Sequence, residues 1–289
     1  MLFQIAPHVM RTPGPVGLGA SGTVLEAVRL MHQHDVGAVL VVENDKLIGI
    51  FTERDVAYRV LAAGLDIAET RVREVMTPDP LSIQADALAT AALEQFAEHN
   101  IRHLPVYEGP RLIGVVALRD IQRVANKQFV EELNHMSVEI VGDCRIAFGA
   151  PQARKLITLP PTASVRQGVE AMKTRDTGAV LVAQDEVLRG IFTERDVIKH
   201  IATEGIDPER TQVAAVMTAD PSTISPGENC DVATELMQEG QFRHLPIVQN
   251  GRPVGILSIR DLYRFYRLSL EAQLNAAMIE RTRHMIAHD

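Results

Sequence analysis

The sequence GIFTERDV occupies residues 49–56 and recurs, letter for letter, at residues 190–197. Many sequences can form a strand that runs into a helix, so secondary structure alone does not require the same eight residues twice. The same spacing holds outside the motif, because Met76, Arg102 and Asp120 each have an identical residue 141 positions later. The second half of the chain therefore repeats the first.

Each half also repeats internally at a spacing of 65 residues, which relates Gly49 to Gly114 and Asp55 to Asp120. Odd repeats contain GAVLV followed by GIFTERD, and even repeats contain RHLP followed by a glycine and an Arg-Asp pair. The expected boundaries are repeats at 1–68, 69–127, 151–209 and 210–268, a linker at 128–150 and a C-terminal helix at 269–289.

The first repeat has the pattern of a β-α-β-β-α unit. Its first helix has an apolar face made of Val24, Ala27, Val28 and Met31. The apolar runs at 38–43 and 47–52 predict two strands joined by a turn at Asn44-Asp45. A second helix begins after Thr52, and Gly64 is suited to end it. Because about 60 residues bury little apolar surface alone, we expect an α+β fold in which repeats pair.

Composition narrows the class of protein. The chain has 289 residues, 46% of them hydrophobic, and no Trp, which predicts about two domains with aliphatic cores. A net charge of −8 disfavours a nucleic-acid partner. We expect no membrane span, because no apolar stretch is long enough, and a cytoplasmic location. Cys144 and Cys230 lack metal-site spacing, so we expect reduced thiols and no metal site.

The repeated motifs resemble those of a known family. VMTPDP (75–80), RHLPV (102–106) and the S/T-x-x-D corner at 52–55 are similar to motifs of the cystathionine-β-synthase (CBS) domain. Two tandem CBS domains form a Bateman module, so four repeats resemble two such modules over nearly the whole chain. The resemblance implies a regulatory protein of signal transduction that binds AMP, ADP or ATP in clefts between paired repeats. We expect no required cofactor and an effector protein that the sequence does not identify. Because two modules with flat helical faces have apolar surface to cover, we also expect a homodimer or a closed pseudo-dimer. No catalytic domain remains after the four repeats are counted, so we expect no catalytic role.

The junction between the second predicted strand and the following helix, at Thr52–Asp55, supports two interpretations. We call this junction the first corner and its equivalents in the later repeats the second, third and fourth corners. Thr-x-x-Asp before an apolar helix is a capping box, in which each side chain bonds the other residue's backbone N–H. The same place also offers free N–H groups suited to a phosphate and a carboxylate suited to two ribose hydroxyls. The resemblance implies the threonine for phosphate and the aspartate for ribose. Both roles can alternate, so both stay open.

The candidate ligand-binding residues come from the four corners and from the basic pairs that precede Leu-Pro. At the corners they are Thr52, Arg54, Asp55, Asp120, Thr193, Arg195, Asp196, Ser258, Arg260 and Asp261. The basic pairs are Arg102, His103, Arg243 and His244. They are either solvated residues at the start of a strand or, as the resemblance implies, side chains that point at ligand phosphates. Ala117 replaces the hydroxyl residue of the second corner, so we expect the second half to bind at least as many nucleotides as the first.

The repeats are also compatible with other functions. The repeats could form a ligand-free scaffold that only holds a dimer together, or bind an S-adenosyl or NAD-type ligand, which has the same ribose. An enzyme is disfavoured because no acid–base pair or nucleophile stands out. The G-x-G-x-x-G at 17–22 suggests a dinucleotide fold on paper, but the matching stretch at 158–163 has no glycine.

Overall fold

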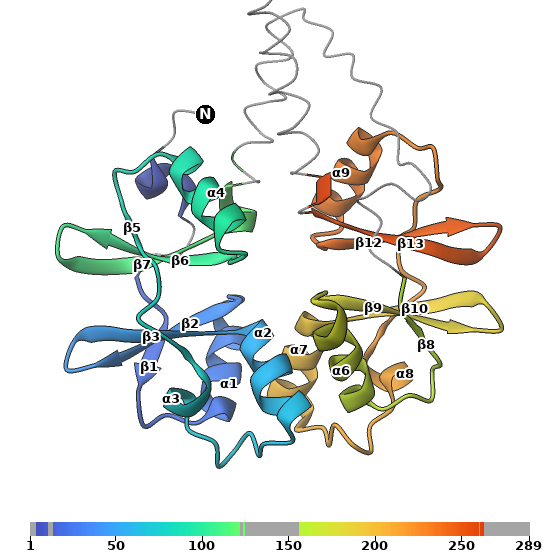
Figure 1. Ribbon diagram of the computed structural model, residues 1–289, viewed down its shortest axis with the longest axis horizontal. Helices are drawn as coiled ribbons and strands as arrows, with labels where there is room; N and C mark the ends of the chain where they lie inside the picture. Colours follow the sequence, from blue (N-terminus) through green and yellow to red (C-terminus); the bar gives the residue numbers. More distant parts are fainter. Residues whose placement is uncertain (1–3, 11–13, 122–123, 125–155, 260, 263–289) are drawn as a thin grey trace, which may run out of the picture. The chain divides into compact units, whose positions relative to one another are not determined.

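The structure, a computed structural model, describes residues 4–10, 14–121, 124, 156–259, 261 and 262. The expected linker at 128–150 and the expected C-terminal helix at 269–289 lie outside these residues. The described chain forms two compact units, whose helices and strands are labelled in Figure 1. The first draws on Met1–Glu139, Val165–Gly178 and Glu194–Thr211, and the second on Ile140–Ser164, Ala179–Thr193 and Gln212–Asp289. Helices of the third repeat thus belong to the unit that contains the first two repeats.

The first repeat forms the predicted β-α-β-β-α unit. Its elements are β1 (Gly17–Gly19), α1 (Val24–His34), β2 (Ala38–Glu43), β3 (Lys46–Thr52), α2 (Glu53–Asp55), η2 (Val56–Val60) and η3 (Leu61–Ala63). The buried residues of α1 are Val24, Ala27, Val28 and Met31, which confirms the predicted face. Asn44 and Asp45 form the β2–β3 turn with positive φ, and Gly64 ends the last helical turn in the left-handed conformation.

The second repeat adds a smaller sheet. Its elements are α3 (Val72–Val75), β4 (Thr77–Pro78), β5 (Ile83–Gln84), α4 (Ala89–Glu98), β6 (His103–Glu108) and β7 (Arg111–Ala117). The strand order is β1-β2-β3-β4 in one sheet and β5-β6-β7 in the other. Ala38, Leu40 and Ile50 of the first repeat pack with Leu112 and Val115 of the second. The first two repeats are therefore paired, as their small size requires.

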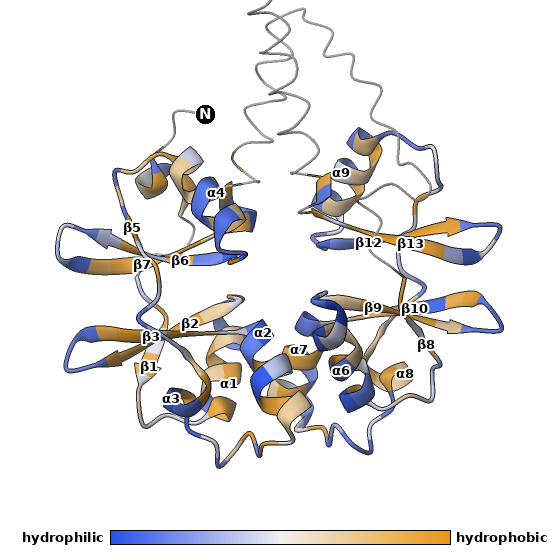
Figure 2. Ribbon diagram, viewed as in Figure 1, coloured by the Kyte–Doolittle hydropathy of each residue, from blue (hydrophilic) through white to orange (hydrophobic). Residues whose placement is uncertain are grey.

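Hydropathy follows this arrangement in the first unit. The tips of the β2–β3 and β6–β7 hairpins are hydrophilic, and apolar colour follows the strands behind them (Figure 2). The N-terminal segment η1 (Ile5–Val9) also packs here, since Ile5 and Val9 are fully buried. The Ile5 N–H donates to the Ala87 carbonyl at 2.9 Å, so this segment docks on the second repeat.

Two helices of the third repeat complete the first unit. They are α6 (Val165–Arg175) and α7 (Glu194–Glu204). Helix α7 packs against α1, and α6 packs against η2 and η3. The Tyr58 hydroxyl on η2 donates to the Met172 carbonyl at 3.1 Å and to the Thr177 carbonyl at 2.9 Å. Helix α7 also contacts α2 and η2, so the helices that follow the first and third repeated corners are in direct contact.

The second unit has the same strand registers. Its elements are β8 (Thr158–Leu159), β9 (Ala179–Gln184), β10 (Val187–Thr193), α8 (Val213–Val216), β11 (Thr218–Ala219), α9 (Cys230–Glu239), β12 (His244–Gln249) and β13 (Arg252–Ser258). One sheet has the order β11-β10-β9-β8, and β12 pairs with β13. Ala179, Leu181 and Ile191 pack with Ile256 of the fourth repeat. The third and fourth repeats therefore also pair through their sheets.

The expectation of reduced thiols is wrong for Cys230. This residue begins α9, is buried, and is disulfide-bonded. Cys144 lies outside the described residues. Cysteine spacing along a chain does not encode which sulfurs meet in the fold, so the sequence carried no signal for this bond.

Candidate ligand-binding site

The first corner is a capping box. Thr52 ends β3, and Asp55 lies three residues later in the first helical turn. The Thr52 N–H and hydroxyl donate to Asp55 Oδ2 at 2.9 and 2.7 Å, and the Asp55 N–H donates to Thr52 Oγ1 at 3.3 Å. The capping interpretation is confirmed, and it fixes the carboxylate beside the end of the strand.

Asp55 is buried, and its surroundings act on its charge in opposite directions. Burial raises the pKa of the Asp55 carboxyl above its ordinary value, because the charged form loses water. The hydrogen bond from Thr52 and the guanidinium of Arg59, whose Nε lies 3.3 Å from Oδ1, lower the pKa and offset part of this effect. One carboxylate oxygen is therefore held by Thr52 and the other faces Arg59.

The VMTP segment (75–78) contacts both the helix after the first corner and the strand before it. Arg59 Nη1 donates to the Val75 carbonyl and to Thr77 Oγ1, both at 3.1 Å. A Cβ atom at Gly49 would lie 2.3 Å from the Met76 sulfur, so β3 has glycine where the methionine crosses it. The repeated motifs GIFTERD and VMTP therefore pack against each other through Gly49 and Met76.

The other corners differ in their cap. In the fourth repeat, the Ser258 N–H and hydroxyl donate to Asp261 Oδ2 at 2.9 and 2.5 Å. In the second repeat, the Ala117 N–H donates to Asp120 Oδ2 at 3.0 Å. Thus the second corner retains the aspartate contact but has no hydroxyl. Its Asp120 is buried, as Asp55 is.

The third corner continues the pattern along the chain. Thr193 ends β10, and Asp196 lies in the first turn of α7, both half-buried. Arg260 of the fourth corner lies outside the described residues.

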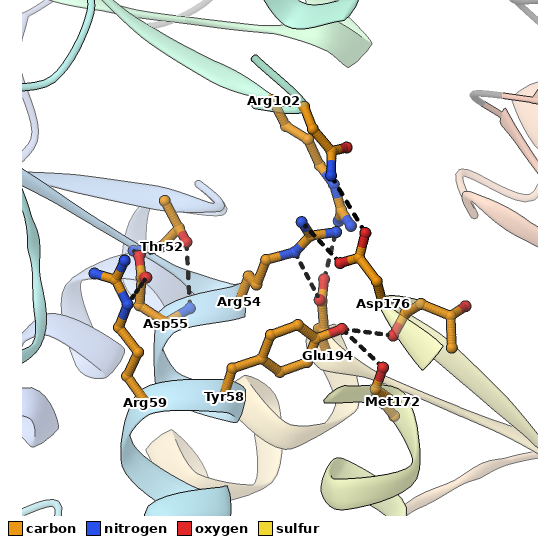
Figure 3. Close-up of polar contacts among 11 residues, drawn as sticks. Thr52, Arg54, Asp55, Tyr58, Arg59, Arg102, Met172, Asp176 and Glu194 are labelled. Atoms are coloured by element: carbon orange, nitrogen blue, oxygen red, sulfur yellow. Dashed lines mark hydrogen bonds and ion pairs between the residues drawn. The ribbon is translucent and has the colours of Figure 1, made fainter. Parts of the chain in front are cut away.

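Two arginines of the first tandem pair converge on one carboxylate (Figure 3). Arg102, just before β6, donates from Nη1 to Glu194 Oε2 at 2.9 Å. Arg54, in α2, places its Nε 3.6 Å from Glu194 Oε1. The Glu194 side chain is 1% exposed, and the side chains of Arg54 and Arg102 are 23% and 18% exposed. This buried anion is therefore neutralised by cations from two different repeats.

The same cluster extends toward Asp176. Arg54 Nη1 lies 3.3 Å from Asp176 Oδ1, and Asn100 Nδ2 donates to Asp176 Oδ2 at 3.2 Å. The guanidinium of Arg54 also lies over the ring of Tyr58, 5.6 Å from its centroid. We call Arg54, Arg102, Asp176 and Glu194 the ion-pair cluster. It has two cations and two anions, so its formal charge is zero.

The corresponding arginine of the third repeat has a similar partner. Arg195 forms an ion pair with Asp35, which stands 141 residues before Asp176. The Asp35 carbonyl also accepts a hydrogen bond from Arg119 Nη2 at 2.7 Å. Both odd corners thus direct their arginine to an aspartate at the end of a helix in the other half of the chain.

The histidines of the basic pairs start strands β6 and β12. A Cβ atom at Gly37 would lie 3.0 Å from His103 Nε2 and 3.3 Å from Glu53 Oε2. His103 therefore reaches from the second repeat to the first corner. His244 is paired in register with Ser258, and Arg243 is half-buried just before it. Each histidine is thus beside a corner of its own tandem pair.

Sequence reasoning missed Glu53, Tyr58, Asp176 and Glu194. A signal for Glu194 was present, because capping explains the threonine and aspartate of Thr-Glu-Arg-Asp but does not require identical residues between them. Asp176 resembled an ordinary exposed helix end, and its side chain is 53% exposed. Nothing in the sequence pairs it with Arg54.

The described residues contain neither a metal-site arrangement nor a membrane-crossing helix. Within them, no group of three or more His, Cys, Asp or Glu side chains is arranged to hold a metal ion. Of the helices in the described part of the chain, none combines the length and the apolar character that a membrane crossing needs.

Comparisons with known proteins agree with the four-repeat pattern. A family model described as CBS domain matches residues 7–62, 72–127, 152–203 and 213–268. The CBS domain-containing protein YhcV of Bacillus subtilis is 38% identical over 117 residues, which cover 40% of this chain and 83% of that protein. CBSCBSPB1 of Arabidopsis thaliana is 28% identical over 269 residues, which cover 83% of this chain and 50% of that protein.

The chain spans about half the length of the Arabidopsis relatives that it matches. Among solved structures, protein MJ1225 from Methanocaldococcus jannaschii is similar over 91% of this chain and 100% of its own, with a TM-score of 0.72 and 18% identity. At this identity the likeness concerns the fold alone.

Proposed function

The chain belongs to the CBS domain family, and from this premise we propose that it is a regulatory protein that senses an adenosine-type nucleotide. The ligand is AMP, ADP or ATP, bound in the cleft between paired repeats. Binding changes the protein's interaction with an effector protein and involves no chemical step. The protein acts in the cytoplasm and assembles as a homodimer.

One observation carries this proposal. Arg54 and Arg102 come from the two repeats of one tandem pair, and their guanidinium groups already hold one anion, the carboxylate of Glu194. Arginine binds carboxylate and phosphate through the same fork of N–H donors. Two converging arginines in a chain with a net charge of −8 form a local site for a ligand phosphate.

The ribose role falls to the aspartates of the corners. Asp55 accepts two bonds at Oδ2 and faces Arg59 at Oδ1, so Oδ1 has acceptor capacity left for a hydroxyl group. His103, beside Gly37 and Glu53, adds a further polar group near the first corner. Asp120, Asp196 and Asp261 hold the same place in the other repeats.

The proposal is tested by calorimetric titration of the full chain. We expect AMP to bind more tightly than adenosine, because only AMP has a phosphate for the arginines. Asp55→Ala removes a charged acceptor for the ribose, worth about 1.5–3 kcal/mol, so affinity should fall about 10- to 150-fold. S-adenosylmethionine and NAD are titrated in parallel, since they contain the same ribose.

Asp66→Ala is the matched control. Asp66 also accepts backbone hydrogen bonds, from the Ala68 and Glu69 N–H groups, but it is exposed and outside the corner. Both variants lose side-chain hydrogen bonds to backbone N–H groups, and only Asp55→Ala loses the proposed ribose contact. Wild-type nucleotide affinity in Asp55→Ala together with Asp196→Ala would remove the ribose role.

A ligand-free scaffold is the second candidate, and the ion-pair cluster favours it. The cluster is formally neutral without any ligand and links the first two repeats to helix α7. If this is its whole purpose, no adenine nucleotide will release heat or raise the melting temperature. The assembly state is measured separately by light scattering, where a monomer mass would contradict the homodimer.

A further inference from the structure

The acidic partner of the two arginines raises a question about selectivity. Glu194 lies in the first turn of α7 and is part of the second GIFTERDV motif. Its carboxylate accepts from Arg102 and pairs with Arg54, with almost no contact with water. It therefore takes up the donors that the proposed phosphate site depends on.

We propose that Glu194 is an internal competitor for anionic ligands and sets the affinity of this site for phosphate. The inference rests on the proposed function in taking Arg54 and Arg102 as the phosphate-binding pair. A ligand phosphate gains their bonds only when the Glu194 carboxylate gives them up. A ligand without an anionic group leaves Glu194 in place.

The guanidinium of Arg54 has donor groups that the ion pairs with Glu194 and Asp176 leave without a hydrogen bond. Arg54 Nε and Nη2 are buried and have no hydrogen-bond partner, although the guanidinium lies near Asp176 and Glu194. The 3.6 Å separation from Glu194 Oε1 is an ion-pair contact that is longer than a hydrogen bond. A phosphate has more acceptor oxygens than a carboxylate and can satisfy both arginines at once.

Charge balance predicts the direction of the effect. The cluster contains Arg54 and Arg102 against Asp176 and Glu194, so an arriving phosphate meets no net positive charge. Removing the charge of Glu194 leaves the cluster with one uncompensated cation, and anion binding then compensates it. A positioning role for Glu194 predicts the reverse, because the arginines would lose their orientation and bind anions less well.

The test uses the full chain and three probes: inorganic pyrophosphate, AMP and adenosine. Glu194→Gln keeps the size of the side chain and one oxygen acceptor for Arg102 but removes the charge. We expect it to bind pyrophosphate and AMP at least about tenfold more tightly than wild type, which matches the lower value of one charge-assisted hydrogen bond. Adenosine affinity should stay unchanged.

Glu204→Gln is the matched control. It makes the same change of charge on the same helix, but Glu204 pairs with His200 and is 55% exposed. Its affinities should equal those of wild type, so a gain limited to Glu194→Gln is not an effect of net charge. An unchanged or weaker affinity of Glu194→Gln for pyrophosphate would overturn the proposal.

A second variant keeps the proposal testable if Glu194→Gln does not fold, since removing one partner of a buried ion pair is destabilising. Glu194→Asp keeps the charge but shortens the side chain, which withdraws the carboxylate from Arg102. We expect a gain in pyrophosphate affinity between those of wild type and Glu194→Gln, and a folded Glu194→Asp with wild-type affinity would refute the competition. Tighter pyrophosphate binding without AMP or adenosine binding in any variant would reject the adenosine ligand and leave the role of Glu194 standing.

Discussion

The contact of Tyr58 with the third repeat leads to a direct prediction for stability. Tyr58→Phe removes only a hydroxyl group, which donates to the carbonyls of Met172 and Thr177 at 3.1 and 2.9 Å. A typical hydrogen bond contributes about 0.5–1.5 kcal/mol net. The Met172 carbonyl keeps the hydrogen bond from the Thr177 N–H at 3.0 Å, so the loss there is at the lower end. We expect Tyr58→Phe to lower the free energy of unfolding by about 1–2 kcal/mol.

Scanning calorimetry is the suitable assay, because the chain has no Trp to report unfolding by fluorescence. A loss of this size lowers Tm by about 2–8 °C, at about 2–4 °C per kcal/mol. Burial first, and then the charge of Glu194, raise the pKa of Tyr58, so its hydroxyl stays a donor and the shift should be equal at about pH 7 and pH 9.

Tyr107→Phe is the control for this prediction. Tyr107 lies in β6, half-buried, and only its backbone is needed for the strand pairing. Both variants remove a tyrosine hydroxyl, but only Tyr58 bonds the third repeat. If the two variants melt at the same temperature, the Tyr58 bonds do not hold α6 to η2.

Three further variants test packing, pH dependence and surface charge. Gly190→Ala should cost about 1–3 kcal/mol in urea unfolding and Gly49→Ala less, because the new Cβ lies 2.8 Å from a β11 carbonyl at Gly190 but meets only a flexible methionine at Gly49; equal costs would contradict this. Burial raises the folded-state pKa of Asp55 above 3.8, so just above that pH the folded state binds more protons at this group than the unfolded state does. The unfolding free energy of wild type, measured relative to Asp55→Asn, should therefore fall as pH rises through this window. If the unfolding free energy of wild type relative to Asp55→Asn instead rises with pH, the pKa of Asp55 is lowered in the folded state and the prediction is wrong. Asp35→Asn breaks the exposed ion pair with Arg195 and should cost less than about 1 kcal/mol, with a smaller Tm shift than Tyr58→Phe.

The sequence predicted the local fold well because its signals are local. The face of α1, the strands at 38–43 and 47–52, and the left-handed Gly64 follow from periodicity and turn residues. It also predicted pairing of repeats, since one unit buries too little by itself. It did not predict that α6 and α7 join the first unit, because periodicity tells which face of a helix is apolar but not which partner covers it.

In the candidate site, too, the sequence predicted the local contacts and not the long-range ones. The contact between Thr52 and Asp55 spans three residues and has a sequence signature. The contact between Arg102 and Glu194 spans 92 residues and has none. Whether the predicted residues bind nucleotide remains a prediction, because a cap and a ribose site use the same side chains.

The second position of each corner explains why GIFTERDV is repeated only in the odd repeats. In the even repeats this position is Leu118 or Ile259, and each packs against an apolar core. In the odd repeats it is Glu53 or Glu194, and both carboxylates are buried. A buried carboxylate is costly unless cations compensate it, so its presence requires arginines in fixed positions. For Glu194 these are Arg54, from the other copy of the motif, and Arg102. Glu194 of the second copy therefore depends on Arg54 of the first, and the loss of Arg54 alone would leave a buried charge at Glu194 with one compensating cation fewer.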